Sequence, residues 1–254
     1  MKLTILGSGT SVPHPQRTSP AHWLETSKGT LLLDASADAP HRMAEEQLDW
    51  PNLDAIWISH FHLDHIGGLT PFLFGIKWAS QTQSRTKPLR IYGPRGLRQL
   101  VDAVNDSNNY RLLEQPFKIE IVEVAPNEDF DILSGLSAAT LSTPHTEESL
   151  ALRLKDDDSK LFVYTSDTGF SDDLAPFAKD AALLLMECSF RRNKPVQQHL
   201  ELADAMRLAH DCAPEKVVLT HLYPEWDHVD LAAEARALWS GETIQANDGL
   251  KLEI

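Results

Sequence analysis

Residues 55–68 read AIWISHFHLDHIGG, an apolar run that changes abruptly into a group of polar side chains. The apolar part, Ala55–Ser59, predicts a buried strand. The polar part carries imidazole nitrogens and carboxylate oxygens, the donor atoms that zinc and similar divalent ions bind. Four such side chains lie close together here, namely His60, His62, Asp64 and His65. This stretch therefore predicts a metal site at the end of a strand, with hydrolysis by a metal-bound hydroxide as its chemistry.

Three further segments repeat the pattern of a β-rich run that ends in a potential metal ligand. His145 lies in STPHT, Asp167 in YTSDTG and His221 in VVLTH. Active sites of layered α/β proteins commonly lie on loops at one edge of a sheet, so we expect these strand ends to converge. The chain then holds seven candidate ligands for two metal ions.

The order of these motifs resembles the metallo-β-lactamase superfamily over nearly the whole chain: HxHxDH, a lone histidine, an aspartate within SDT, and a late TH. Within it, the chain is most similar to the ribonuclease Z-like phosphodiesterase branch. Residues 3–13, LTILGSGTSVP, resemble the first strand and glycine turn of that branch, and residues 187–190, ECSF, resemble its acidic segment. His199 precedes His221 at the spacing where that branch carries an extra catalytic histidine. True β-lactamases and glyoxalase II-type enzymes do not share this late arrangement.

The resemblance implies an α/β fold, a metallo-β-lactamase-type αββα sandwich in which helices flank two mixed β-sheets. The sequence pattern alone indicates only α/β. The length suffices for one full core, and no linker-like segment or internal repeat divides the chain, so we predict a single metallo-β-lactamase-like hydrolase domain over residues 1–254. Helices are predicted at Asp38–Leu48, Leu69–Trp78, Pro94–Asn105, Leu200–His210 and Val229–Trp239.

The resemblance also assigns the ligands. The first ion would be held by His60, His62 and His145, and the second by Asp64, His65 and His221, with Asp167 bridging the two. An extended turn at residues 60–65 would let the first two histidines face one ion while the chain bends toward the other. The expected cofactors are two divalent ions, Zn2+ first and Mn2+ or Fe as alternatives, because His/Asp sites accept all three. Asp64 is also expected to take or orient the proton of the attacking water.

His199 is the predicted general acid, which would protonate the leaving oxygen of a phosphodiester. Its setting departs from one part of the family. Transfer-RNA-processing members carry His-Ser-Thr, whereas residues 199–202 read HLEL. That pattern is more like the cyclic-phosphate phosphodiesterase of phosphonate breakdown, whose extra N-terminal cysteine cluster this chain lacks. The alternative role for His199 is to neighbour the N-cap of the helix that follows.

The formal net charge of −14 bears on the substrate, because phosphate contacts from basic residues dominate RNA binding. The segment between His145 and Asp167 holds one predicted hairpin, which leaves no room for the arm that grips tRNA. We therefore expect a small or cyclic phosphodiester, with RNA as a weaker candidate partner. Ribonuclease Z-type tRNA 3′-processing is the second hypothesis. A metal-dependent lactone or thioester hydrolase and a non-catalytic binding protein are further alternatives.

The remaining residues give secondary expectations. Arg191 and Arg192 are candidate phosphate contacts, and a second basic group is interpreted as a solvated face: Arg85, Lys87, Arg90, Arg95 and Arg98. Asp34 is expected to orient ligand histidines. The roles of His14 and His22 stay open because the loop between them could fold over the active site.

The cell compartment and assembly are also expectations. Cys188 and Cys212 do not make a disulfide framework, which fits a cytoplasmic enzyme. No apolar run approaches the roughly 20 residues of a membrane span, and the N-terminus does not resemble a secretory signal. The family resemblance further suggests a homodimer.

Overall fold

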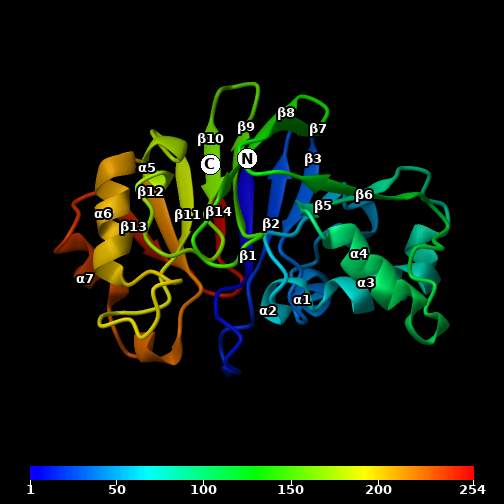
Figure 1. Ribbon diagram of the computed structural model, residues 1–254, viewed down its shortest axis with the longest axis horizontal. Coiled ribbons are helices and arrows are strands. Elements are labelled where there is room, and N and C mark those ends of the chain that lie inside the picture. Colours follow the sequence, from blue (N-terminus) through cyan, green and yellow to red (C-terminus); the bar gives the residue numbers. More distant parts are fainter.

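Two seven-stranded sheets pack face to face in the computed structural model, which describes residues 1–254, and helices cover both outer faces (Figure 1). The first sheet has the order β14 (Lys251–Glu253), β1 (Lys2–Gly7), β2 (Ala21–Thr26), β3 (Gly29–Leu33), β4 (Ala55–Trp57), β5 (Leu89–Pro94), β6 (Ile119–Val124). The second has the order β13 (Glu242–Gln245), β12 (Lys216–Thr220), β11 (Leu183–Glu187), β10 (Leu161–Tyr164), β9 (Leu150–Lys155), β8 (Leu136–Ser142), β7 (Asp129–Leu133). Both sheets mix parallel and antiparallel pairs, which confirms the predicted fold class.

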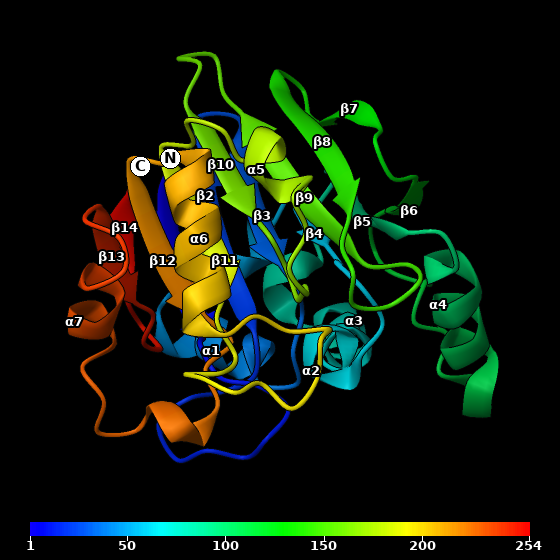
Figure 2. The same cartoon turned by 60° about the vertical axis from the view of Figure 1, so that its left-hand side comes forward.

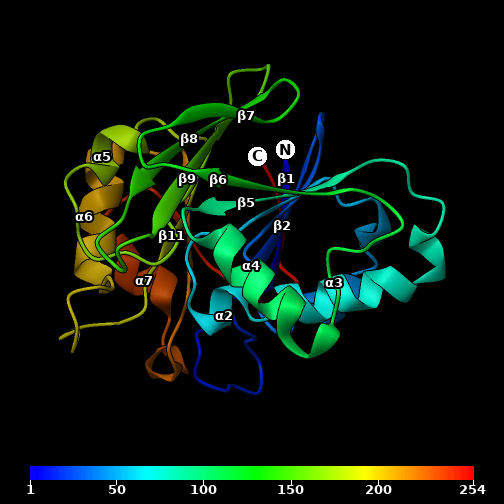
Figure 3. The same cartoon turned by 45° about the vertical axis from the view of Figure 1, so that its right-hand side comes forward.

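The helices fall into two groups, on opposite outer faces of the sandwich (Figures 1 and 3). The first sheet is covered by α1 (Ala39–Glu45), α2 (Leu63–Ile66), α3 (Leu69–Trp78) and α4 (Leu97–Asp106). The second is covered by α5 (Leu174–Phe177), α6 (Leu202–Cys212) and α7 (Leu231–Arg236). Short 3-10 turns lie at Trp50–Asn52, Ser80–Thr82, Ser107–Asn109 and Pro224–Trp226. None of the helices has the length and apolar character that crossing a membrane requires.

Three apolar layers hold the sandwich together, and strand alternation assigns side chains to them. In β2, Leu24 faces the layer between the sheets, while its neighbour Trp23 faces the helices. Leu152 and Phe162 meet the inter-sheet layer from the second sheet. Burial of this kind stabilises by roughly 25 cal/mol per Å² of apolar surface. The result is a rigid frame that carries the loops at its edge.

The loops that follow β1, β4, β11 and β12 gather at one edge of the sandwich, the lower edge in Figures 1 and 2. Backbone hydrogen bonds join the two sheets there: Leu150 N donates to Ser59 O at 3.1 Å, and Leu222 N donates to Ser8 O at 2.9 Å. The predicted ligand segments all end at this edge.

The predicted start of the helix Pro94–Asn105 is wrong. Pro94 completes β5, and the helix begins at Leu97. Gly96 has a φ of 103°, a left-handed conformation, and its amide and that of Arg98 both donate to the carboxylate of Glu123. A carboxylate from the neighbouring strand therefore starts the helix, which sequence alone does not reveal.

Candidate metal centre

The metal-binding run is shaped by a helical turn, not by the extended turn that we predicted. His62 is extended, and its carbonyl accepts hydrogen bonds from the amides of His65 and Ile66, at 2.9 and 3.0 Å. Successive side chains on a helix diverge by about 100°. Asp64 and His65 therefore enter the site, whereas Leu63, which precedes them, points to solvent with 80% of its surface exposed.

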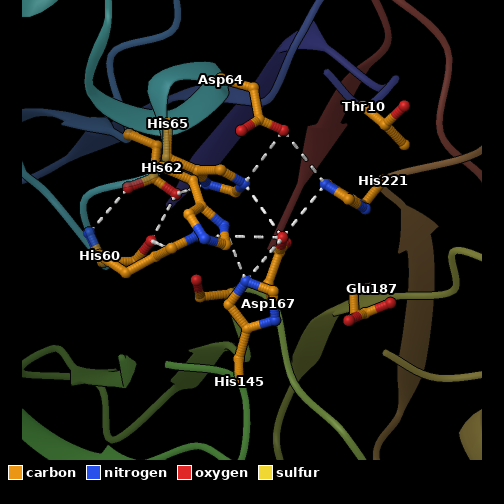
Figure 4. A network of polar contacts seen from close by, with 12 residues as sticks. Thr10, His60, His62, Asp64, His65, His145, Asp167, Glu187 and His221 are labelled. Carbon is orange, nitrogen blue, oxygen red and sulfur yellow. Dashed lines mark hydrogen bonds and ion pairs between the residues drawn. The ribbon is translucent and has the colours of Figure 1, made fainter. Parts of the chain in front are cut away.

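All seven predicted ligands converge at this edge (Figure 4). Their ligand atoms form two groups, and the atoms of each group all lie within 4.8 Å of one another. One group is His60, His62, His145 and Asp167, and the other is Asp64, His65 and His221. The Oδ2 atom of Asp167 lies between the groups. It is 3.2 Å from His221 Nε2, 3.3 Å from His65 Nε2 and 3.7 Å from His145 Nε2. The family resemblance assigns the same two sets of residues to two ions, and occupation by two ions stays a prediction.

Unpaired nitrogens show that the residues fit metal ions. The Nε2 atoms of His60, His65 and His221 are buried and have no hydrogen-bond partner. A buried polar atom without a partner costs about 1–3 kcal/mol. Three such atoms aimed at one carboxylate form a donor set that suits zinc and related divalent ions.

The other ring nitrogen of each of these histidines is held by a protein oxygen. His65 Nδ1 donates to Asp34 Oδ2 at 2.7 Å, and His60 Nδ1 contacts the Ser59 hydroxyl at 3.0 Å. His221 Nδ1 lies 2.8 Å from the Ser189 hydroxyl. Holding Nδ1 fixes the ring orientation and leaves Nε2 for an ion.

Asp34 is the centre of the hydrogen bonds beneath the site, as its predicted role requires. Besides His65, its carboxylate accepts from the amide and hydroxyl of Ser59, at 2.8 and 2.9 Å, and from the hydroxyl of Tyr164 at 2.7 Å. All four residues are buried. No sequence signal identifies Tyr164, because an aromatic residue inside a strand is ordinarily part of the core.

Electrostatic interactions shift the pKa values of the candidate ligands in different directions. Burial raises the pKa of Asp167, but nearby His221 and His65 outweigh it and hold that pKa well below its ordinary value. Burial and His65 lower the pKa of His60, so its imidazole is neutral. Burial also lowers the pKa of His65, yet Asp167 and Asp34 raise it well above the ordinary value. Metal binding at His65 must therefore displace a proton.

His199 lies at the rim of the centre. Its ring stacks on His221, with centroids 5.2 Å apart, and meets His145 edge-on at 4.7 Å. Its Nδ1 donates to Glu187 Oε1 at 2.8 Å, which leaves Nε2 free for substrate. Burial lowers the pKa of His199, but the hydrogen bond and charge of Glu187 outweigh this and raise it above the ordinary value. The ring therefore keeps its proton at higher pH.

Glu187 and Ser189 were missed as functional residues. The Ser189 hydroxyl donates to Glu187 Oε2 at 2.7 Å while contacting His221 Nδ1, so one carboxylate supports both a metal ligand and the predicted acid. In the sequence, residues 187–190 stand out only as a family-like segment. The available signal is an acidic residue directly after an apolar run, residues 181–186.

Most of these basic residues have partners within the protein. The Arg191 guanidinium pairs with Glu234, and its role as a phosphate contact stays a prediction. In the second basic group, Arg85 donates to backbone carbonyls, and three others pair with carboxylates: Lys87 with Asp54, Arg90 with Glu120, and Arg98 with Asp102. Arg95 and Arg192 have no such partner.

His14 and His22, whose roles the sequence leaves open, lie in different environments. His14 Nε2 lies 3.0 Å from Asp227, a residue that also pairs with Arg17, so the loop after β1 is tied to the loop after His221. His22 is fully buried against Tyr164, and burial together with His65 lowers its pKa to about 3. Neither lies among the converging ligands.

Comparison with known proteins places these features in a family. A family model described as "Anti-Pycsar protein Apyc1" matches residues 1–240. The chain is 27% identical over 256 residues to the probable metallo-hydrolase YhfI of Bacillus subtilis, with all of both chains covered. It is 24% identical over 305 residues to a ribonuclease Z of Thermoplasma volcanium, covering 100% of this chain and 97% of the other.

Solved structures agree on the fold. The crystal structure of the YhfI protein, of metallo-β-lactamase fold, superposes with a TM-score of 0.83 at 25% identity, covering 99% of each chain. A diphosphatase from the PhnP family superposes with a TM-score of 0.77 at 21% identity, over 100% of this chain and 97% of that one.

Proposed function

Because the chain belongs to the anti-Pycsar protein Apyc1 family and has the metallo-β-lactamase fold, we propose that this metal-dependent hydrolase is a dinuclear-zinc phosphodiesterase acting on a small or cyclic phosphodiester. One observation carries the proposal: seven metal-ligand atoms, that of Asp167 among them, converge beside a histidine whose pKa Glu187 raises. The first feature suits activation of a nucleophile, and the second suits release of an oxygen leaving group.

The residues divide the reaction between them. Two divalent ions, when bound, would supply a nucleophile at neutral pH and neutralise charge on the phosphate. Asp64 lies 3.6 Å from His221 Nε2 and 3.8 Å from His65 Nε2. Burial raises the pKa of Asp64, but its contact with His221 outweighs this, so the carboxylate stays ionised and can accept or orient the proton of the attacking water.

His199 acts on the other side of the reaction. As the P–O bond breaks, its Nε2 donates a proton to the departing oxygen, and the ring becomes neutral. Glu187 holds the opposite nitrogen and so orients the ring. A thioester would not require such an acid, because a thiolate departs without being protonated, which favours the phosphodiester over that alternative.

A small substrate is favoured over RNA by charge and by shape. The formal charge of −14 opposes a polyanion. Between His145 and Asp167 the chain forms only β9, β10 and their turns, so no arm extends from this segment. Pre-tRNA processing remains the second candidate because a ribonuclease Z relative matches over the whole chain.

The test is turnover of zinc-loaded and manganese-loaded protein on bis-p-nitrophenyl phosphate, with a thioester and a lactone assayed in parallel. We expect phosphodiester cleavage and little reaction of the carbon esters. Asp167→Asn is the matched inactive control, with bound metal measured in both proteins. A fully metallated wild type that hydrolyses the lactone or thioester but leaves the phosphodiester intact would refute the proposal.

A further inference from the structure

A groove of about 450 Å3 opens directly beside the candidate metal centre. Its walls include His145, Phe170, Lys194, Gln197 and Gln198. We propose that this groove binds the leaving group of the substrate, and that it selects a planar, uncharged group. The inference rests on the proposed phosphodiesterase function and names the half of the substrate that this side of the site recognises.

The groove lies next to His199, the proposed general acid. His145 lines it, and the residue that follows Gln198 is His199. The rings of His145 and His199 meet at 4.7 Å. In an in-line displacement the leaving oxygen departs opposite the nucleophile, and it must reach the proton donor. A leaving group that contacts His199 is therefore carried toward this groove.

The backbone of the groove wall is fixed. His145 Nδ1 donates to the carbonyl of Gln198 at 3.0 Å. Gly169 N donates to Pro144 O at 3.0 Å, and a Cβ on Gly169 would lie only 2.2 Å from the carbonyl of Gln197. Only glycine permits that approach. The main chain at Gln197 and Gln198 is thus held in place, while both side-chain amides are exposed.

The charges around the groove argue for an uncharged occupant. Lys194 has 11% of its side chain exposed, and its ammonium donates to Asp204 at 2.5 Å. The Arg207 guanidinium lies 4.4 Å from the ring centre of Phe170 and pairs with Asp172. No unpaired cation lines the groove to bind an anion. Two glutamine amides and an aromatic surface instead suit a planar group that forms hydrogen bonds.

A second groove provides a contrast. It has a volume of about 470 Å3, and its lining includes Phe61, Arg95, Glu147 and Glu148. Its charged walls differ from the neutral amides of the first groove, and one chain segment, residues 144–150, contributes lining residues to both grooves. A phosphodiester bound across this segment would present chemically different halves to them.

The test uses two substrates that share a leaving group. Bis-p-nitrophenyl phosphate and methyl p-nitrophenyl phosphate both release p-nitrophenolate and differ only in the group that stays on phosphorus. Loss of both amides in the Gln197→Ala/Gln198→Ala double variant should lower kcat/KM about fivefold on both substrates. Gln99→Ala, at an exposed position of α4, is the matched control and should change neither value. Bound metal is measured to confirm that the Gln198 carbonyl still supports His145.

Each outcome decides the matter. An equal loss on both substrates with unchanged metal supports leaving-group binding. A loss confined to the bis-aryl substrate would overturn the inference, because the groove would then hold the retained group. Unchanged kinetics on both would also overturn it. No turnover of either substrate by metallated wild type would instead mean that the proposed function itself has failed, and the inference with it.

Discussion

At the scale of single residues, His199 is the side chain whose role depends most on the substrate's chemistry. A general acid matters when the leaving oxygen is a poor leaving group, and it matters little when a stabilised phenolate departs unaided. We predict that His199→Ala lowers kcat about 10²–10⁴-fold on a diester with an alkyl leaving group, and far less on bis-p-nitrophenyl phosphate. The measurement is kcat for both substrates at equal metal content. An equal loss on both, or loss of metal, would assign His199 a structural role.

Glu187 is predicted to set the pH range over which the proposed acid, His199, works. An acid acts only below its pKa, and Glu187 raises the pKa of His199, so wild-type activity should extend to higher pH. Glu187→Gln keeps an oxygen that can accept hydrogen bonds but removes the charge. The alkaline limb of the kcat/KM profile should then move to lower pH on the alkyl diester. An alkaline limb at the wild-type position, in a variant with full metal, would show that Glu187 does not tune the acid.

The candidate ligands could be predicted from sequence because their chemistry is local. Four of them lie within residues 60–65, and the other three follow β-rich runs, so short segments were enough to identify them. Glu187 and Ser189 could not be identified in this way. Their roles arise from contacts between β11 and residues far along the chain, and no single segment displays those contacts.

At the scale of elements, the strands were more predictable than the turns between them. The predicted strand Ala55–Ser59 contains β4, and the predicted helix Leu69–Trp78 coincides with α3, because ten residues are enough to show a helical period. The α2 turn was missed because four residues cannot display a helical period. The start of α4 was missed because Glu123, from another strand, caps it.

The loop between β1 and β2 offers a test of how an element is held beside the site. The carboxylate of Asp248 accepts four hydrogen bonds, from the amides and hydroxyls of Ser8 and Thr18, at 2.7–2.9 Å. Removing it leaves these donors without their partner. We predict that Asp248→Ala lowers the free energy of unfolding by about 2–3 kcal/mol, measured by urea titration. Asp248→Asn should lose roughly half as much, because its one remaining oxygen can still serve Ser8. An alanine variant as stable as wild type would contradict this account.

At the scale of the whole molecule, net charge governs which phosphodiesters can approach. The chain has 37 acidic and 23 basic side chains. Of the seven basic residues described above, only Arg95 and Arg192 have no partner within the protein, so few of these cations are free to contact phosphates. Binding of a nucleic acid releases counterions in proportion to those contacts. The logarithm of the binding constant Kobs therefore falls with the logarithm of the salt concentration, with a slope of about −0.7 per contact for single strands.

We therefore predict that tRNA inhibits hydrolysis of bis-p-nitrophenyl phosphate weakly, and that the slope of log Kobs against log salt concentration is shallower than about −2. The small diester itself should show little salt dependence, because the ions and buried ligands of the proposed metal centre would be screened less than surface charges. Inhibition constants measured at several salt concentrations check both statements.

Arg95→Ala and Arg192→Ala should each flatten the tRNA slope by less than about one unit, whereas substitution of the paired Arg90 should leave it unchanged. Tight tRNA inhibition with a slope steeper than about −4 would instead favour the RNA-processing alternative, because so many phosphate contacts would require a basic surface that the isolated charges do not provide.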